Sequence, residues 1–245
     1  MRLLFRLTFY SISNILQGLE ILDAFLERNP SLPETNPELN NAVDHAPLEI
    51  EVKFYLSDIH PTRDRLVAMN AAHSGPVFET NIRFENSRKS LKKEGALLRL
   101  RHDERSRLTY KSTPSTPDGQ FKIHRELEVE VGDFQVCKDI LKALGYFPEQ
   151  VYEKWRETFV VDGTCLVIDT MPYGVFLEIE GNKSEIREMA DRLGLDWKKR
   201  IILNYLEIFE RIQREEGLAF ADITFDNFKA VHLDINKYLP LLYAG

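Results

Sequence analysis

Five consecutive residues, from Glu49 to Lys53, alternate charged and apolar side chains inside a segment that otherwise reads as a buried β-strand. Successive side chains of a strand point to opposite faces, so Glu49, Glu51 and Lys53 share one face and the apolar residues share the other. A function that needs charges on that face would explain the pattern. For one strand alone, an exposed sheet surface would explain it equally well.

The same alternation recurs in other predicted strands, and each of these strands sorts its charges by sign. Like charges at successive positions on one face repel each other, so an ordinary solvated surface does not favour this arrangement. The acidic sets are Glu49/Glu51, Glu126/Glu128/Glu130 and Glu178/Glu180, and the basic sets are Arg99/Arg101 and Lys154/Arg156. Sorting by sign indicates ligands of both charges. A divalent metal bound together with a phosphate chain is such a combination.

The composition predicts a soluble globular protein in a reducing compartment. The chain has 245 residues, 43% of them hydrophobic, which is enough for one large domain with appended segments. Its formal net charge of -7 argues against a nucleic-acid partner, because general binding to phosphate backbones needs a basic surface. Cys137 and Cys165 are too few for a disulfide framework, so a cytoplasmic location is expected.

Residues 1–47 predict an amphipathic helix followed by a linker. Leucine and isoleucine recur on one helical face between Leu3 and Leu22, which suits docking on a neighbour or on a membrane surface. Polar residues interrupt every apolar run before it reaches the roughly 20 residues of a transmembrane helix, so no transmembrane segment is expected. The prolines and asparagines from Asn29 to Pro47 are typical of a linker. A catalytic domain is therefore expected to begin near Leu48.

Beyond Leu48 the chain predicts eight strands with helices at some junctions. Strands are expected at about 48–55, 77–84, 96–102, 106–112, 123–131, 151–161, 164–171 and 174–181. Helices are expected from about Asp58 to before Ser74, and over 134–144, 184–193 and 203–215. The charged stretch 85–95 is expected to be a mobile lid or loop, and the last thirty residues are ambiguous.

Eight strands are too many for a ferredoxin-like sheet and fit a closed antiparallel barrel. Inward and outward side chains alternate along every barrel strand, so the charged faces would converge on a lumen while the apolar faces pack under helices. Charges inside a lumen cost free energy unless they pair or bind ions. The sequence therefore predicts an α+β fold, a closed eight-stranded antiparallel β-barrel with flanking helices, whose interior is a binding tunnel.

The order and spacing of these segments resemble the CYTH superfamily, also called triphosphate tunnel metalloenzymes, which includes class IV adenylate cyclases and thiamine triphosphatases. The Glu-x-Glu-x-Lys of residues 49–53 is the hallmark of that family. The other matching segments are Leu98-Arg99-Leu100-Arg101, Leu108-Thr109-Tyr110-Lys111, Arg125-Glu126-Leu127-Glu128, Phe176-Leu177-Glu178-Ile179-Glu180 and Asn204-Tyr205-Leu206-Glu207. The resemblance suggests a tunnel domain over residues 48–216, with a C-terminal extension over 217–245.

The resemblance implies a triphosphate-bearing small molecule bound in the tunnel with Mg²⁺ or Mn²⁺. Mg²⁺ prefers carboxylate and phosphate oxygens, while Arg and Lys grip phosphate through a bidentate fork and a compact charge. The implied metal ligands are Glu49, Glu51, Glu128, Asp169, Glu178 and Glu180. The implied phosphate contacts are Lys53, Arg99, Arg101, Lys111, Lys154 and Arg156. Glu51 and Lys53 are expected to be catalytic.

Two reactions are compatible with such a site, and both displace a group at phosphorus. The leading hypothesis is a metal-dependent triphosphatase, which directs water at the terminal phosphate of inorganic triphosphate or a nucleoside triphosphate. A class IV-type adenylate cyclase instead directs the ribose 3′-hydroxyl of ATP at the α-phosphate and releases pyrophosphate. A third hypothesis is a non-catalytic sensor that binds polyphosphate or a nucleotide. The sequence is compatible with a homodimer.

Arg83 departs from the family pattern. It stands where the family usually has a tyrosine, within Thr80 to Glu85. In thiamine triphosphatases a tyrosine near this position is thought to act with the hallmark lysine on the attacking water, and arginine cannot act as a base at ordinary pH. Thiamine triphosphate is therefore a less favoured substrate.

Overall fold

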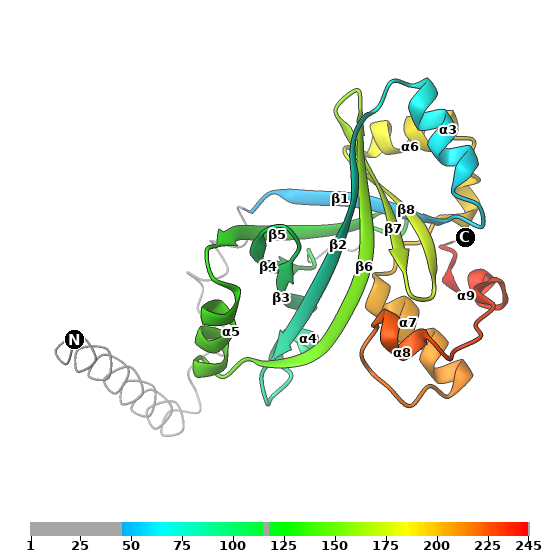
Figure 1. Ribbon diagram of the computed structural model, residues 1–245. Helices are drawn as coiled ribbons and strands as arrows, with labels where there is room; N and C mark the ends of the chain where they lie inside the picture. Colours follow the sequence, from blue (N-terminus) through cyan, green and yellow to red (C-terminus); the bar gives the residue numbers. More distant parts are fainter. Residues whose placement is uncertain (1–45, 115–117, 245) are drawn as a thin grey trace. The chain divides into compact units, whose positions relative to one another are not determined.

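Eight antiparallel strands close into a ring (Figure 1). The computed structural model describes residues 46–114 and 118–244 of the chain. The strands are β1 (Leu48–Tyr55), β2 (Ala72–Glu85), β3 (Ala96–His102), β4 (Ser106–Ser112), β5 (Lys122–Val131), β6 (Phe147–Val161), β7 (Thr164–Met171) and β8 (Gly174–Glu180). Their order around the ring is β1-β5-β4-β3-β2-β6-β7-β8, and β8 pairs again with β1. The prediction of a closed eight-stranded antiparallel barrel is confirmed.

Strands β2 and β6 are longer than the sequence predicts. β2 begins at Ala72 and passes through Gly75 and Pro76, with a register shift against β6 between Ser74 and Val77. Proline lacks the N–H that a sheet ladder requires, and an irregularity of this kind accommodates it within a strand. The preceding helix, α3 (His60–Ala68), accordingly ends before Asn70, which adopts a positive φ of 54°.

Helices cover the apolar outer faces of the strands in separate groups. α3 and α6 (Lys183–Arg192) lie near each other in Figure 1, and Leu66, Ile186 and Met189 belong to one core with residues of β1, β7 and β8. α5 (Phe134–Ala143) contributes Leu141 to a second core with residues of β2 and β3. No helix in the described part of the chain is both long enough and apolar enough to cross a membrane.

The charged stretch between β2 and β3 contains a short helix, α4 (Ser90–Lys93), where the sequence suggests a loop. The carboxylate of Glu85 accepts hydrogen bonds from the backbone N–H groups of Leu91 (3.2 Å) and Lys92 (2.8 Å). These bonds satisfy donors at the start of the helix that have no partner within it. A side chain at the end of β2 therefore holds this turn against the strand.

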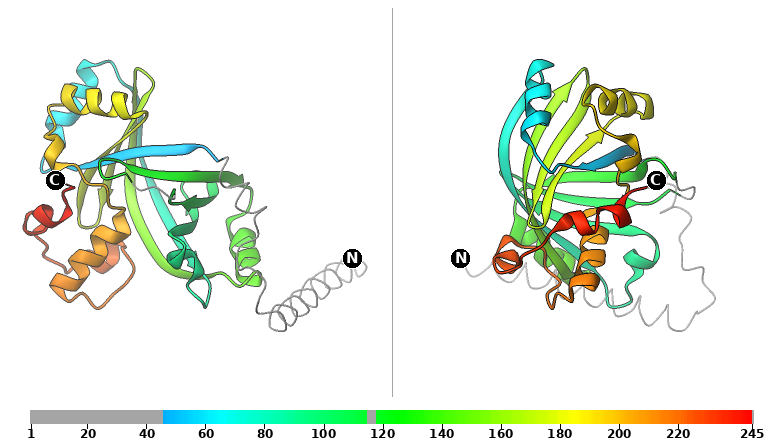
Figure 2. Two further views of the ribbon diagram at one scale, coloured as in Figure 1. Left: turned by 180° about the vertical axis from the view of Figure 1, so that it is seen from behind. Right: turned by 90° about the vertical axis from the view of Figure 1, so that its right-hand side faces the viewer.

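The end of the chain packs on α7 (Tyr205–Glu216) and on the sheet. It contains α8 (Phe225–Phe228), the 3₁₀ helix η2 (Ile235–Lys237) and α9 (Leu239–Leu242), and Figure 2 shows them beside α7. Phe228, Ile235 and Leu242 share one core with residues of α7 and with Phe176 of β8. The expected helix and linker over 1–47 fall almost entirely outside the described residues. The boundaries of the three expected segments stay a prediction.

The start of α7 is fixed by a reciprocal capping arrangement. The side chain of Asn204 accepts a hydrogen bond from the Glu207 N–H at 2.8 Å, and the Glu207 carboxylate accepts one from the Asn204 N–H at 2.7 Å. Such a capping box satisfies two donors at the helix start. Gly217 ends the helix in the left-handed conformation that favours glycine. The first residue of α7, Tyr205, is thereby held at the cavity described below.

Candidate active site

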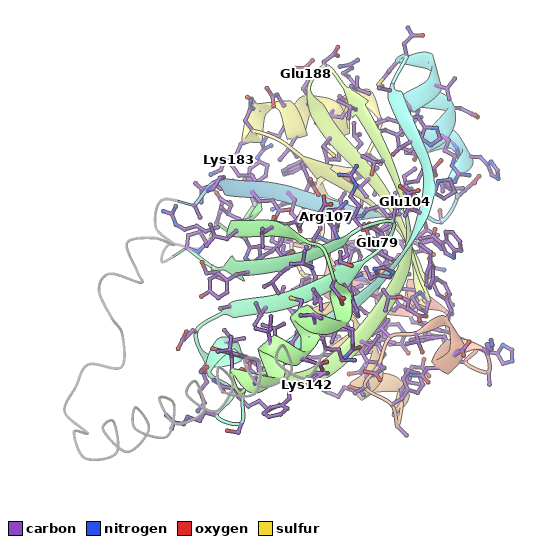
Figure 3. The ribbon with its side chains drawn as sticks, turned by 60° about the vertical axis from the view of Figure 1, so that its left-hand side comes forward. Glu79, Glu104, Arg107, Lys142, Lys183 and Glu188 are labelled. Carbon is purple, nitrogen blue, oxygen red and sulfur yellow. The ribbon has the colours of Figure 1, made fainter. Side chains whose placement is uncertain are left out.

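The charged faces of the strands converge on one cavity of about 670 Å³ inside the ring. The register between β1 and β8 pairs Lys53 with Glu178, which carry opposite charges, and Glu51 with Glu180, which carry the same charge. Figure 3 draws the side chains, with Glu79 among the strands and Glu188 out on α6. The alternation read from the sequence therefore places charge on the inside of the ring.

Three carboxylates come together where β1 and β8 meet. Glu49, Glu51 and Glu180 each offer an oxygen atom, and these atoms lie within 4.8 Å of one another. Burial, followed by the negative charges of Glu178 and Glu51, raises the pKa of Glu180 to about 7. A cation would relieve this repulsion. Because all three donors are hard oxygen atoms, the cluster fits Mg²⁺ or Mn²⁺.

Lysine side chains border the acidic cluster. Burial alone would raise the pKa of Glu51, but the charges of Lys122 and Lys53 outweigh it and hold the pKa well below its usual value. Lys122 Nζ donates to Glu51 at 2.6 Å, and Lys53 donates to the same oxygen. Glu49 accepts from Lys111. Glu51 is therefore ionised at neutral pH before any metal binds.

Lys53 is almost completely buried, with 1% of its surface exposed. Its amino group contacts Glu51 and lies 3.0 Å from a carboxylate oxygen of Glu178. Burial would lower the pKa of Lys53, but the charges of Glu178 and Glu51 raise it well above its usual value. Lys53 therefore stays protonated and acts as a fixed positive charge.

Asp169 lies behind the cations of β6 and away from the acidic cluster. It is fully buried, and its carboxylate accepts hydrogen bonds from Lys154 Nζ at 2.9 Å and from Arg156 Nε and Nη2 at 2.8 and 2.7 Å. Arg156 also donates to Glu178 at 2.8 Å. These contacts suit a carboxylate that orients cations. The structure does not bring Asp169 together with Glu49, Glu51 and Glu180.

Strands β3 and β4 supply the remaining predicted phosphate contacts. Arg101 Nη2 lies 3.4 Å from both carboxylate oxygens of Glu128, and Arg99 Nη2 donates to Thr109 at 3.2 Å. Lys111 lies 3.1 Å from Glu126. Glu128 thus pairs with arginine on this side of the cavity and not with the acidic cluster. The roles of the predicted ligands stay predictions.

Glu79, which was not predicted from the sequence as a site residue, lies between three cations. It is 2% exposed, and its carboxylate lies 3.4 Å from Arg101, 3.5 Å from Lys154 and 3.7 Å from Arg156. The sequence signal at Glu79 is weak, because the polar residues Thr80 and Asn81 follow it in β2. As the single acidic residue of the predicted strand 77–84, it also does not form a like-charged set.

Lys122 and Tyr205 were also missed as site residues, for different reasons. The predicted strand began one residue after Lys122, so its shared face with Glu126 and Glu128 was not recognised. Tyr205 comes from a helix, and strand alternation gives no information about helices. Arg83, which stands where the family usually has a tyrosine, lines the cavity and lies 3.5 Å from Glu149.

A closed antiparallel ring whose interior carries paired charges defines a β-tunnel protein with a site for charged ligands. The family model for the CYTH domain matches residues 47–211, and the chain belongs to this family. None of the curated proteins compared with the chain matches it.

Solved structures with the same fold come from several organisms. The PH1012 protein from Pyrococcus horikoshii OT3 is 26% identical, with a TM-score of 0.56, and the match covers 65% of this chain and 98% of that one. An adenylate cyclase candidate from Vibrio parahaemolyticus is 16% identical, covering 68% and 99%, with a TM-score of 0.57. The Hippeastrum protein HpAC1, described as having a dominant triphosphatase activity, is 17% identical, covering 66% and 95%, with a TM-score of 0.51. The last two matches show the fold alone.

Proposed function

We propose that this protein is a divalent-metal-dependent triphosphatase that hydrolyses inorganic triphosphate or nucleoside triphosphates inside the ring. One observation carries the proposal: the carboxylates of Glu49, Glu51 and Glu180 cluster at one seam of a cavity whose other strands present lysine and arginine. A metal and a phosphate chain would satisfy these two regions together. Membership of the CYTH family supports the same class of ligand.

The charge balance of the cavity supports metal dependence. Among its lining residues, lysines and arginines are as numerous as carboxylates. The cavity therefore has no excess of positive charge to neutralise a triphosphate, which carries several negative charges. A divalent cation that enters with the triphosphate would supply the missing positive charge.

The residues that line the cavity would have different roles according to their positions. Arg99, Arg101, Lys111, Lys154 and Arg156 would bind phosphate oxygens, as the sequence predicted. Lys53 would place its fixed charge next to the phosphate on which negative charge develops, since preorganised charges stabilise a transition state without reorganising. Glu49, Glu51 and Glu180 would hold the metal. When bound, such an ion polarises phosphoryl oxygens and activates water.

The direct test is to incubate the 245-residue chain with inorganic triphosphate or ATP in the presence of Mg²⁺ or Mn²⁺. Orthophosphate, pyrophosphate and cyclic AMP are measured together. We expect orthophosphate release that EDTA abolishes. Formation of cyclic AMP and pyrophosphate alone would replace the proposal with an adenylate cyclase, and binding without turnover under either metal would favour a sensor.

A matched pair of variants locates the activity. Glu51→Gln keeps the size of the side chain and removes a charge from the acidic cluster, so we expect it to abolish metal-dependent orthophosphate release. Glu104→Gln makes the same chemical change at an exposed position and should retain activity. Equal activities of the two variants would contradict the assignment of the site.

A further inference from the structure

The aromatic ring of Tyr205 lies close to the amino groups of two lysines inside the ring of strands. Lys53 Nζ is 5.2 Å from the ring centroid, and Lys154 Nζ is 5.4 Å from it. The Tyr205 hydroxyl donates a hydrogen bond to Asp169 at 3.0 Å. Tyr205 also lines the cavity with only 7% of its surface exposed, so these contacts are largely shielded from water.

Each of the two lysines also contacts two carboxylates. Lys53 contacts Glu51 and Glu178, and Lys154 contacts Asp169 and Glu79. A carboxylate fixes an ammonium group but cancels its charge. An aromatic face attracts the ammonium through its quadrupole and leaves the positive charge in place. Tyr205 is therefore the uncharged contact that both lysines share.

No direct strand pairing fixes the two lysines relative to each other. Lys53 is on β1, whose neighbours are β5 and β8, whereas Lys154 is on β6, whose neighbours are β2 and β7. The ring of Tyr205 spans this separation. We propose that Tyr205 is a positioning residue, which holds the ammonium groups of Lys53 and Lys154 in place for a phosphate group.

The backbone around Tyr205 is anchored well enough for this role. The hydroxyl of Tyr173 donates to the Tyr205 carbonyl at 2.9 Å. The backbone of Lys53 exchanges two hydrogen bonds with Ile201, at 2.9 and 2.7 Å, just before the helix that begins with Tyr205. The helix start and one of the two lysines are thus tied to each other directly.

Two substitutions separate the ring from the hydroxyl. Tyr205→Phe keeps the aromatic face and loses the bond to Asp169, whereas Tyr205→Leu loses both. With inorganic triphosphate as the probe, kcat/KM is expected to fall roughly tenfold in Tyr205→Leu, the size of one to two cation–π contacts, and to stay within about twofold of wild type in Tyr205→Phe. This kinetic measurement rests on the proposed triphosphatase function.

A second measurement does not depend on activity. In NMR spectra, an aromatic face shifts the ε-methylene protons of nearby lysines upfield, and Lys53→Arg and Lys154→Arg identify the two signals. The upfield shift is expected in wild type and in Tyr205→Phe, and its loss is expected in Tyr205→Leu. If the shifts follow this pattern while no triphosphate is hydrolysed, the proposed function fails and the positioning role stands.

Phe209→Leu is the matched control for losing a buried aromatic ring from α7. Phe209 is fully buried on the same helix, and its ring packs against Tyr173, Phe220 and Phe228. The Phe209→Leu substitution should lower the free energy of unfolding without changing the chemical shifts of the two lysine signals. The proposal is overturned if Tyr205→Leu leaves these signals in place, or if Tyr205→Phe loses as much kcat/KM as Tyr205→Leu.

Discussion

Replacing Glu79 with glutamine should change how the stability of the protein depends on acidity. Burial would raise the pKa of this carboxyl, but Lys154, Arg156 and Arg101 lower it from 4.5 to about 2. The difference of about 2.5 between the two pKa values corresponds to about 3 kcal/mol of folding free energy at neutral pH.

The direction follows from proton binding. A carboxyl with a lower pKa in the folded protein contributes its full stability above its unfolded pKa, here 4.5, and loses it as the pH falls toward 2. At pH 3 the unfolded chain is mostly protonated at this residue and the folded protein is mostly ionised. About 2 kcal/mol of the contribution is lost by that point.

Urea unfolding of the wild type and Glu79→Gln, followed by circular dichroism between pH 7 and pH 3, measures this loss. A cost of the substitution that does not depend on pH is the same at pH 7 and pH 3. The difference in free energy of unfolding between the wild type and Glu79→Gln should therefore shrink by about 2 kcal/mol on acidification. Glu104→Gln, which makes the same chemical change at an exposed position, is measured beside Glu79→Gln as the matched control. A wild-type advantage over Glu79→Gln that is the same at pH 7 and pH 3 would refute the reasoning.

Other substitutions test the packing and pairing around the same site. Asp169→Ala removes the buried carboxylate that Lys154 and Arg156 share, although Glu79 and Glu178 stay near them, and should lower the free energy of unfolding by about 3–5 kcal/mol, measured in urea. Asn204→Ala removes the cap of α7 and should cost about 1 kcal/mol in the same measurement. Leu177→Ala, at a fully buried position, should cost about 2–5 kcal/mol, and a loss below 1 kcal/mol would contradict tight packing there. Inorganic triphosphate with Mg²⁺ should raise the melting temperature, and EDTA should reverse the rise.

Strand alternation explains why the ring could be predicted. Charged and apolar residues alternate in β4, and the expected bounds of β3, β4 and β7 agree with the observed ones. The prediction was wrong about the length of β2, because Gly75 and Pro76 read locally as a break. β2 continues past Gly75 and Pro76 because it pairs with β6 on both sides of a register shift. This pairing joins residues far apart in the chain, so the residues around Gly75 do not predict it.

The candidate site could be predicted only in part, for a related reason. Parity along a strand indicates which side chains face inward, but which of them meet depends on the order of strands around the ring. Glu180 reaches Glu49 and Glu51 because β8 pairs with β1, whereas Asp169 on β7 lies opposite Arg156 on β6. Tyr205 enters from a helix, and no strand pattern could place it.

The tie between the last residues and the middle of the chain has a consequence for protein production. The match to the CYTH domain ends at residue 211, inside α7, yet the core around α7 continues to Leu242, and the Ala244 N–H donates to the Arg200 carbonyl at 2.9 Å. The unit that folds is therefore longer than the unit that the family shares. An expressed fragment cut at the family boundary would split α7, remove Ile212 and uncover the buried side chains of Ile208 and Phe209, so soluble material requires the chain through residue 244.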